Sequence, residues 1–205
     1  KNCVSFLKNI QFIDDDMGIA HIGMVATMIR ELPPLVFAKI LLETNYFEDY
    51  DEYEILVIFS MFNNIHVKPE YEHFTIHTRK VFARSDTAYK VTEQLCLLSE
   101  RVKEIDTNMK NALAQHYIIP YIEEPNLVLH CLCKWMEAND SEQASQVLLE
   151  LSREHGISSG DFVKAIFKLG NVINEMIHIG ECDNQLIFLE KLHSMPEKIM
   201  KFIAV

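Results

Sequence analysis

The longest regular feature of the sequence is an apolar seam near its middle, and it restricts the fold more than any other feature. Its members are spaced alternately by three and four residues without interruption: Ala88, Val91, Leu95, Leu98, Val102, Ile105, Met109, Ala112 and His116. Such a heptad pattern is typical of a continuous α-helix. A helix over residues 78–115 would be about 55 Å long, enough to cross a whole domain. We expect it to be a structural spine; a coiled-coil dimer is the weaker alternative, because the flanking positions show no consistent pairing of opposite charges.

Helical spacing of the apolar residues also dominates outside this seam. Apolar residues make up 49% of the 205 positions, which suffices for a core, and there are only 6 glycines and 6 prolines. The sequence therefore predicts an all-α fold: a helical bundle with one long central helix. Residues 1–10 could close a first helix, and residues 18–21 are expected to be extended before a helix over 23–32.

Proline, glycine and capping residues predict where several helices begin and end. Pro33 and Pro34 stop one helix and suit the first turn of the next. A helix is expected over 51–63, with carboxylates in its first turn, and a loop over 64–78. Near the C-terminus, Gly156 is placed for a helix C-cap, and Ser158 with Asp161 resembles a capping box. Two short helices, 183–193 and 196–204, are expected to end the chain.

The charge of the chain excludes a general polyanion binder. The formal net charge is −11, with acid concentrated in residues 12–17 and 46–54. Because non-specific nucleic-acid affinity comes from clustered lysine and arginine, any nucleic-acid contact must be local. A short basic run, Arg79, Lys80, Arg84 and Lys90, is interpreted as a solvated face.

The sequence carries no recognisable cofactor, metal or catalytic motif. It lacks a GxxxxGK[ST] motif, a DExH tetrad and any glycine-rich phosphate loop, so the chain by itself has no means of holding a nucleotide. The spacing of His66, His73 and His77 fits no familiar metal site, and Cys131 and Cys133 would face apart on a helix beside His130. The five scattered cysteines, Cys3, Cys96, Cys131, Cys133 and Cys182, are expected to be reduced core thiols. Trp135 is expected to fill core.

The stretch GDFVKAIFKLGNVINEM, residues 160–176, is the most strongly amphipathic. At 100° per residue, one side holds the apolar set Phe162, Ile166, Leu169, Ile173 and Met176, and the other holds Lys164, Lys168, Asn171 and Glu175. The polar side is either a solvated face or a contact surface for a ligand. Two lysines four residues apart repel slightly, which favours an anionic partner. Gly170, at the edge of the apolar face, favours close approach of another helix.

This stretch resembles the ratchet helix in the C-terminal helical domain (DSHCT type) of exosome-associated DExH-box RNA helicases, the superkiller and Mtr group. Residues 19–41 resemble that family's passage from winged helix to helical bundle, and residues 53–67 resemble its E-[apolar]-x-x-[apolar]-[FL]-S-x-F segment. The Trp135 helix and the C-terminal segment LHSMPEKIMKFIAV are also similar. The resemblance implies that residues 1–22 end a winged-helix-like segment and that residues 23–205 form the helical bundle.

In that family the ratchet helix lies along the RNA strand that leaves the motor core. The resemblance places Lys168 at the position of an RNA-contacting arginine, Asn171 at that of a glutamate facing the nucleic acid, and Lys164 at a further basic position. With Glu175, the acidic end of the pattern, these form the expected RNA-binding set. The chain begins with Lys and is expected to be a fragment of a longer protein. The resemblance implies that motor domains elsewhere in the same polypeptide would hold ATP and magnesium.

Two functions follow from these observations. The first is a non-catalytic C-terminal domain of an ATP-dependent RNA helicase that guides single-stranded RNA, with an RNA-degradation or processing complex as a further partner. The alternative is an acidic all-α module that binds a protein and no nucleic acid, which suits the net charge better. No signal sequence and no apolar stretch long enough to span a membrane is found, so an intracellular location, cytoplasmic or nuclear, and no membrane contact are expected.

Overall fold

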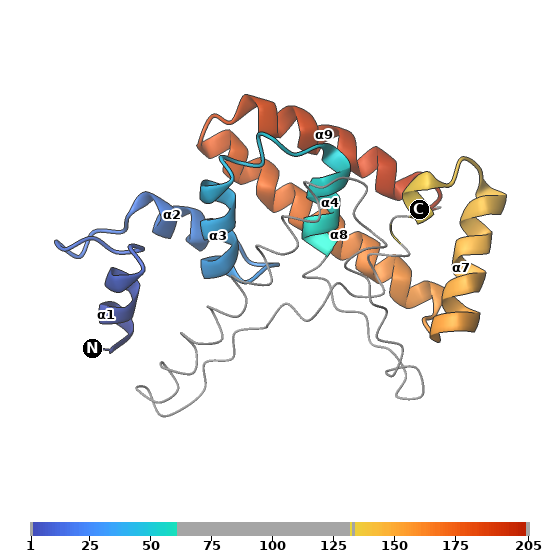
Figure 1. Ribbon diagram of the computed structural model, residues 1–205, viewed down its shortest axis with the longest axis horizontal. Helices are drawn as coiled ribbons and strands as arrows, with labels where there is room; N and C mark the ends of the chain where they lie inside the picture. The colour runs from blue at the N-terminus through green and yellow to red at the C-terminus, as the bar shows by residue number, and fades with distance from the viewer. Residues whose placement is uncertain (1, 61–131, 133, 204–205) are drawn as a thin grey trace.

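The computed structural model describes residues 2–60, 132 and 134–203 (Figure 1). Within these ranges the chain is mostly helical, as predicted, and holds no β-strand beyond an isolated antiparallel bridge between Ile13 and Ile19. None of the helices in this part of the chain is long and apolar enough to cross a membrane. The predicted spine over 78–115, the loop over 64–78 and the basic run from Arg79 to Lys90 lie outside the described residues.

The N-terminal region contains α1 (Asn2–Asn9), α2 (His21–Met28) and α3 (Pro34–Glu43), of which α2 and α3 pack against each other. Pro34 is the first residue of α3, where its fixed φ suits a helix and its missing N–H costs nothing, as predicted. The helix predicted over 23–32 ends earlier than expected, because the backbone is extended at Ile29, with φ −89° and ψ 123°. The N–H groups of Arg30 and Glu31 then donate to Glu175 instead of continuing the helix.

A left-handed turn connects α3 to α4 (Glu52–Ser60). Asn45, Tyr46 and Phe47 have consecutive φ angles of 47°, 56° and 55°. This conformation costs a residue with a Cβ atom about 1–2 kcal/mol, and none of the three is glycine. The turn carries the Tyr46 and Phe47 rings into the core, where each lies about 6 Å from the Phe188 ring of α9. Burial of two aromatic rings offsets the backbone cost.

The C-terminal region contains α7 (Ser141–His155), α8 (Ser159–Cys182) and α9 (Leu186–Met200), and α8 and α9 run side by side (Figure 1). The predicted caps are confirmed. Gly156 ends α7 with a left-handed φ of 63°, and the Ser158 hydroxyl accepts from the Asp161 N–H at 3.1 Å at the start of α8. These local signals fix the beginning of α8 independently of its packing.

The chain ends in one helix, α9, rather than in the predicted pair, because Pro196 lies inside it. Proline removes a backbone hydrogen bond there, but the buried positions continue past it without a change of spacing: Phe188, Leu192, Met195 and Ile199. Packing of this continuous apolar face against α8 keeps the helix intact across the proline.

Two glycines of α8 differ in how closely α9 approaches them. A Cβ atom added at Gly180 would lie 3.0 Å from Leu189 Cδ2 and 3.3 Å from Phe188 Cδ1, which is too tight. At Gly170, where the sequence led us to expect close approach, the nearest atom would be Met200 Cε at 3.4 Å, an ordinary contact. The tight approach of the two helices is therefore at Gly180.

Trp135 fills core, as predicted. Its ring is buried, lies edge-on to Phe162 at 5.5 Å, and donates its Nε1–H to the Ile199 carbonyl at 2.8 Å. The prediction for the cysteines is wrong at Cys182, which is exposed. Cys182 lies five helical turns after Lys164 and therefore on the same solvent-facing side of α8.

Candidate nucleic-acid interface

The buried side of α8 is the one that the sequence predicts. All five residues of the predicted apolar set are buried, and Ala165, Val172 and Ile179 extend the face; the predicted set comprises Phe162, Ile166, Leu169, Ile173 and Met176. Because the side chains of a helix are fixed relative to one another, the position of this face determines which residues face outward.

The four predicted contact residues are not equivalent in the structure. The Lys164 side chain is 80% exposed, and its Nζ atom lies 3.0 Å from Asp161 Oδ1 one turn earlier. Asn171 is exposed as well. Lys168 is half-buried, and its ammonium group has no hydrogen-bond or ion-pair partner among the described residues. These three side chains lie along one side of α8.

Glu175, the fourth predicted residue, has a structural contact. It is half-buried, and its Oε2 atom accepts from the backbone N–H groups of Arg30 and Glu31, each at 3.0 Å. Hydrogen bonds of this kind to an ionised carboxylate are stronger than those to a neutral acceptor. Glu175 therefore attaches the loop after α2 to the side of α8.

The most exposed line of residues on α8 only partly coincides with the predicted contact set. It comprises Lys164, Phe167, Asn171, Asn174 and His178, at alternating spacings of three and four residues. At 100° per residue, its centre lies about 50° from that of the predicted set. Asn174 and His178 could have been found from the sequence, because they continue the helical spacing from Asn171.

Phe167 could not have been found in this way. An aromatic residue in an amphipathic helix is ordinarily assigned to the core, yet the Phe167 side of α8 is open and the residue is 45% exposed. An exposed ring between amide and ammonium groups presents a flat surface on which an unstacked base can lie. The exposed line thus combines hydrogen-bonding groups with an aromatic platform.

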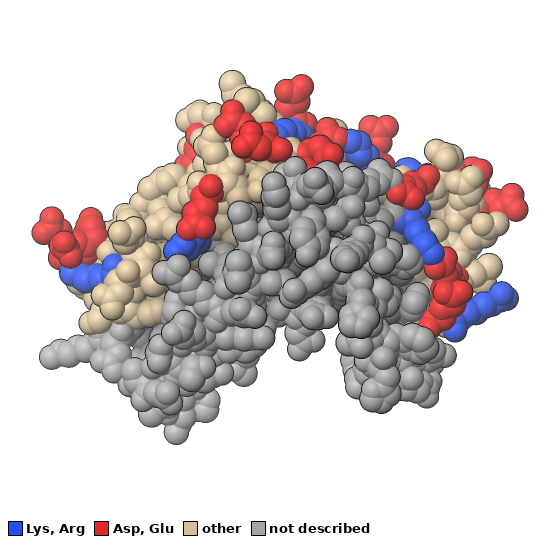
Figure 2. Space-filling view, viewed as in Figure 1, with Lys and Arg blue, Asp and Glu red and all other residues tan. Residues whose placement is uncertain are grey.

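The charge along this line is unusual for the chain. Between residues 162 and 180 the sequence contains two lysines and one acid, Glu175, whose Oε2 atom already accepts hydrogen bonds from the loop after α2. On the face shown in Figure 2, the coloured surface carries numerous red Asp and Glu groups interspersed with blue Lys and Arg. Beyond Lys164, which pairs with Asp161, the outward line of α8 therefore carries no acidic side chain, which suits an anionic ligand.

The described residues contain no group of three or more His, Cys, Asp or Glu side chains placed to hold a metal ion. The other residues considered from the sequence, His66, His73, His77, His130, Cys131 and Cys133, lie outside the described residues. The exposed side chains along α8 offer hydrogen bonding, stacking and charge.

Comparisons with known proteins find no match for this sequence, either among protein families or among curated proteins. The resemblance to the helicase domain stays a prediction from the sequence.

Proposed function

We propose that this chain is the non-catalytic C-terminal helical domain of an ATP-dependent RNA helicase and that α8 guides single-stranded RNA. The observation that carries the proposal is the outward line of α8, where Lys164, Phe167 and Asn171 lie together and no acidic residue between positions 162 and 180 is exposed. A rigid helix positions such groups better than a loop would.

Each residue has a distinct part in this proposal. Lys164 and Lys168 neutralise phosphates, Asn171 donates to or accepts from a base or sugar, and the Phe167 ring stacks on a base. Glu175 fixes α8 to the loop after α2 and thereby holds the other three side chains in position. The lysines act as point charges, because they lack the planar fork with which arginine grips a phosphate.

The finer architecture belongs to the same proposal. Residues 1–22 would end a winged-helix-like segment, and residues 23–205 would form a bundle around the helix over 78–115. The motor domains of the same polypeptide would hold ATP and magnesium, and the whole would act inside the cell, in the cytoplasm or nucleus, with an RNA-degradation or processing complex.

The proposal can be tested by titrating the chain with a fluorescent single-stranded oligoribonucleotide at two salt concentrations. Lys168→Ala should weaken binding by about 1–3 kcal/mol and lower the salt dependence. Lys39→Ala is the matched control, since Lys39 is also a half-buried lysine but lies on α3, paired with Glu43 at 3.6 Å. In the presence of the motor domains, Lys168→Ala should also reduce unwinding or RNA-stimulated ATP turnover. Equal affinity of both variants and the unmodified chain would overturn the assignment.

An acidic module that binds another protein is the second candidate function. It is favoured by the net charge of −11 and by two adjacent apolar residues at the start of α9, Leu186 and Ile187, which are 77% and 53% exposed. If this candidate is right, the oligonucleotide titration shows no binding at either salt concentration, and Leu186→Asp weakens a protein complex while Lys168→Ala leaves it intact.

A further inference from the structure

Two carboxylates connect the two helix pairs of the described chain, α2 with α3 and α8 with α9. Glu175 accepts from the backbone N–H groups of Arg30 and Glu31, just after α2 ends. Asp183, the C-cap of α8, lies next to His21, the first residue of α2, with His21 Nε2 3.1 Å from each carboxylate oxygen. The contacts pair the start of α2 with the end of α8, so α2 is attached at both of its ends.

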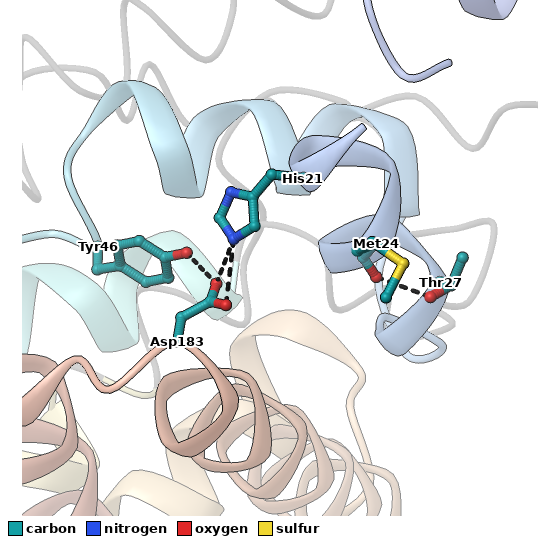
Figure 3. Close-up of polar contacts among 5 residues, drawn as sticks. All are labelled: His21, Met24, Thr27, Tyr46 and Asp183. Atoms are coloured by element: carbon teal, nitrogen blue, oxygen red, sulfur yellow. Dashed lines mark hydrogen bonds and ion pairs between the residues drawn. The ribbon is translucent and has the colours of Figure 1, made fainter. Parts of the chain in front are cut away.

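The two attachments differ in kind. At Glu175 the donors are backbone N–H groups, which cannot rotate away as a side chain can. At Asp183 the donors are two side chains, as Figure 3 shows: the Tyr46 hydroxyl and the His21 imidazole. Tyr46 is buried, and its ring packs against Phe188 of α9. The His21 side chain is 60% exposed, whereas that of Asp183 is 15% exposed.

This difference determines which contact breaks first. Asp183 is a carboxylate mostly removed from water, and Tyr46 satisfies one side of it from the interior. When His21 turns toward solvent, water can hydrate its ring at once, and Asp183 retains its interior donor. Loss of the His21 contact therefore leaves no buried charge without a partner, whereas loss of the Tyr46 contact would weaken the support of a buried carboxylate.

The turn that carries Tyr46 adds a second asymmetry. Asn45, Tyr46 and Phe47 adopt consecutive left-handed conformations, which residues with a Cβ atom rarely do and which persist only where the surrounding structure holds them. The Tyr46 hydroxyl bond to Asp183 holds this turn against α8. The turn is thus part of the fixed side of the contact, and His21 is the movable side.

We propose that the contact between His21 and Asp183 is a latch, and that the Glu175 contact is the hinge about which the start of α2 opens away from α8. Opening moves α2 and the preceding segment, residues 12–20, while α8, α9 and the left-handed turn keep their places. The latch is independent of the proposed function, because it concerns only contacts between helices of this chain.

Native-state hydrogen exchange of the 205-residue chain tests the latch. In His21→Ala, the amides of α2 should exchange about three- to tenfold faster than in the unmodified chain, because opening becomes easier there. The amides of α8 between Ile166 and Ile173 should change by less than about twofold. His178→Ala is the matched control, since His178 is an exposed histidine on α8 with no described partner; it should leave α2 unchanged.

Two further variants separate the latch from the hinge. Tyr46→Phe should accelerate exchange in residues 44–50 without matching the effect of His21→Ala on α2. Glu175→Ala combined with His21→Ala should accelerate exchange in α2 more than either change alone. Uniform acceleration of α2 and α8 in His21→Ala would mean a global loss of stability, and unchanged exchange in α2 would mean that the contact holds nothing; either result overturns the proposal.

Discussion

The two halves of α8 use the same amphipathic pattern differently. In the first half, Ser159–Gly170, the polar side faces solvent, with Lys164 and Phe167 exposed. In the second half, Asn171–Cys182, Glu175 bonds the loop after α2, and Asp183, the residue that follows the helix, bonds His21 and Tyr46. The polar side of α8 is continuous in the sequence. In the structure, its first part is exposed to solvent and its second part makes tertiary hydrogen bonds.

The division follows from where α2 lies. The segment 21–31 contacts α8 through Glu175 and Asp183, both in or just after its C-terminal half, where the two carboxylates accept hydrogen bonds from this segment. In the first half, the described partner of Lys164 is Asp161 of α8 itself. The composition of a helix face therefore does not determine which contacts it makes. Those contacts depend on which other element of the chain packs against that face.

Substitutions on the buried side should have the largest effects, and they should be similar in both halves. Phe162→Ala should lower the free energy of unfolding by about 3–5 kcal/mol and Ile173→Ala by about 2–5 kcal/mol, because both side chains are fully buried. Phe167→Ala, which removes the same ring from the exposed side of the first half, is the control and should change it by no more than about 0.5 kcal/mol. Urea denaturation measures all three. A cost at Phe167 equal to that at Phe162 would refute the division of faces.

Glu175 should distinguish the halves on the polar side. Glu175→Ala should lower the free energy of unfolding by about 1.5–3 kcal/mol, because two backbone N–H groups lose their charged acceptor. Glu175→Gln keeps an acceptor oxygen and should cost less. Asn171→Ala, one turn earlier and exposed, should cost no more than about 0.5 kcal/mol. If Asn171→Ala and Glu175→Ala proved equally costly, the polar side would not be divided as described.

The two glycines should respond with opposite signs. Gly180→Ala should destabilise by about 1–3 kcal/mol, because the added methyl would meet Leu189 Cδ2 at 3.0 Å and Phe188 Cδ1 at 3.3 Å, and the buried Phe188 ring has little room to give way. Gly170→Ala, in the first half, should stabilise by about 0.5–1 kcal/mol through helix propensity, since its nearest contact is an ordinary one at 3.4 Å. Thermal unfolding of both variants measures the difference. Stabilisation by both would show that α9 does not approach Gly180 closely.

The end of α8 should also respond to alkaline pH. Burial, followed by the hydrogen bond to Asp183 and its charge, raises the pKa of the Tyr46 hydroxyl above its usual value of 10.0. The folded chain therefore keeps this proton at a pH at which the unfolded chain loses it, and the free energy of unfolding falls as pH rises above 10. The slope from one such group is at most about 1.4 kcal/mol per pH unit.

Tyr46→Phe provides the control for this slope. The pKa of Tyr50 is raised too, chiefly by burial, so part of the slope should persist in this variant. Denaturation at pH 9, 10 and 11 measures the loss. An unchanged slope in Tyr46→Phe would show that folding does not raise the pKa of the Tyr46 hydroxyl.

Features set by neighbouring residues could be predicted from the sequence. Pro34 begins α3, Ser158 and Gly156 mark the boundary between α7 and α8, and the spacing of the apolar residues identifies the buried side of α8, because each depends on contacts within a few residues. These are the features for which local backbone geometry and helical period suffice.

Features that depend on distant partners could not be predicted. Glu175 bonds residues about 145 positions away, and Asp183 bonds a residue 162 positions away, so no local spacing reveals either. The left-handed turn at Asn45–Phe47 contains no glycine, the residue from which such a turn could be predicted. Pro196 is accommodated inside α9 because α9 packs on α8. The contact set predicted on α8 is accordingly centred about 50° from the most exposed line of that helix.

The fluorescence of Trp135 reports on the packing of the C-terminal core. It is the chain's only tryptophan, and the rings of Phe162 and Phe202 and the Ile199 carbonyl surround its indole. Its fluorescence therefore arises from one site, where α8 meets the last turn of α9. Detachment of that turn would admit water to the indole and shift its emission to longer wavelength, so the docking of the chain's end can be followed without attaching a dye.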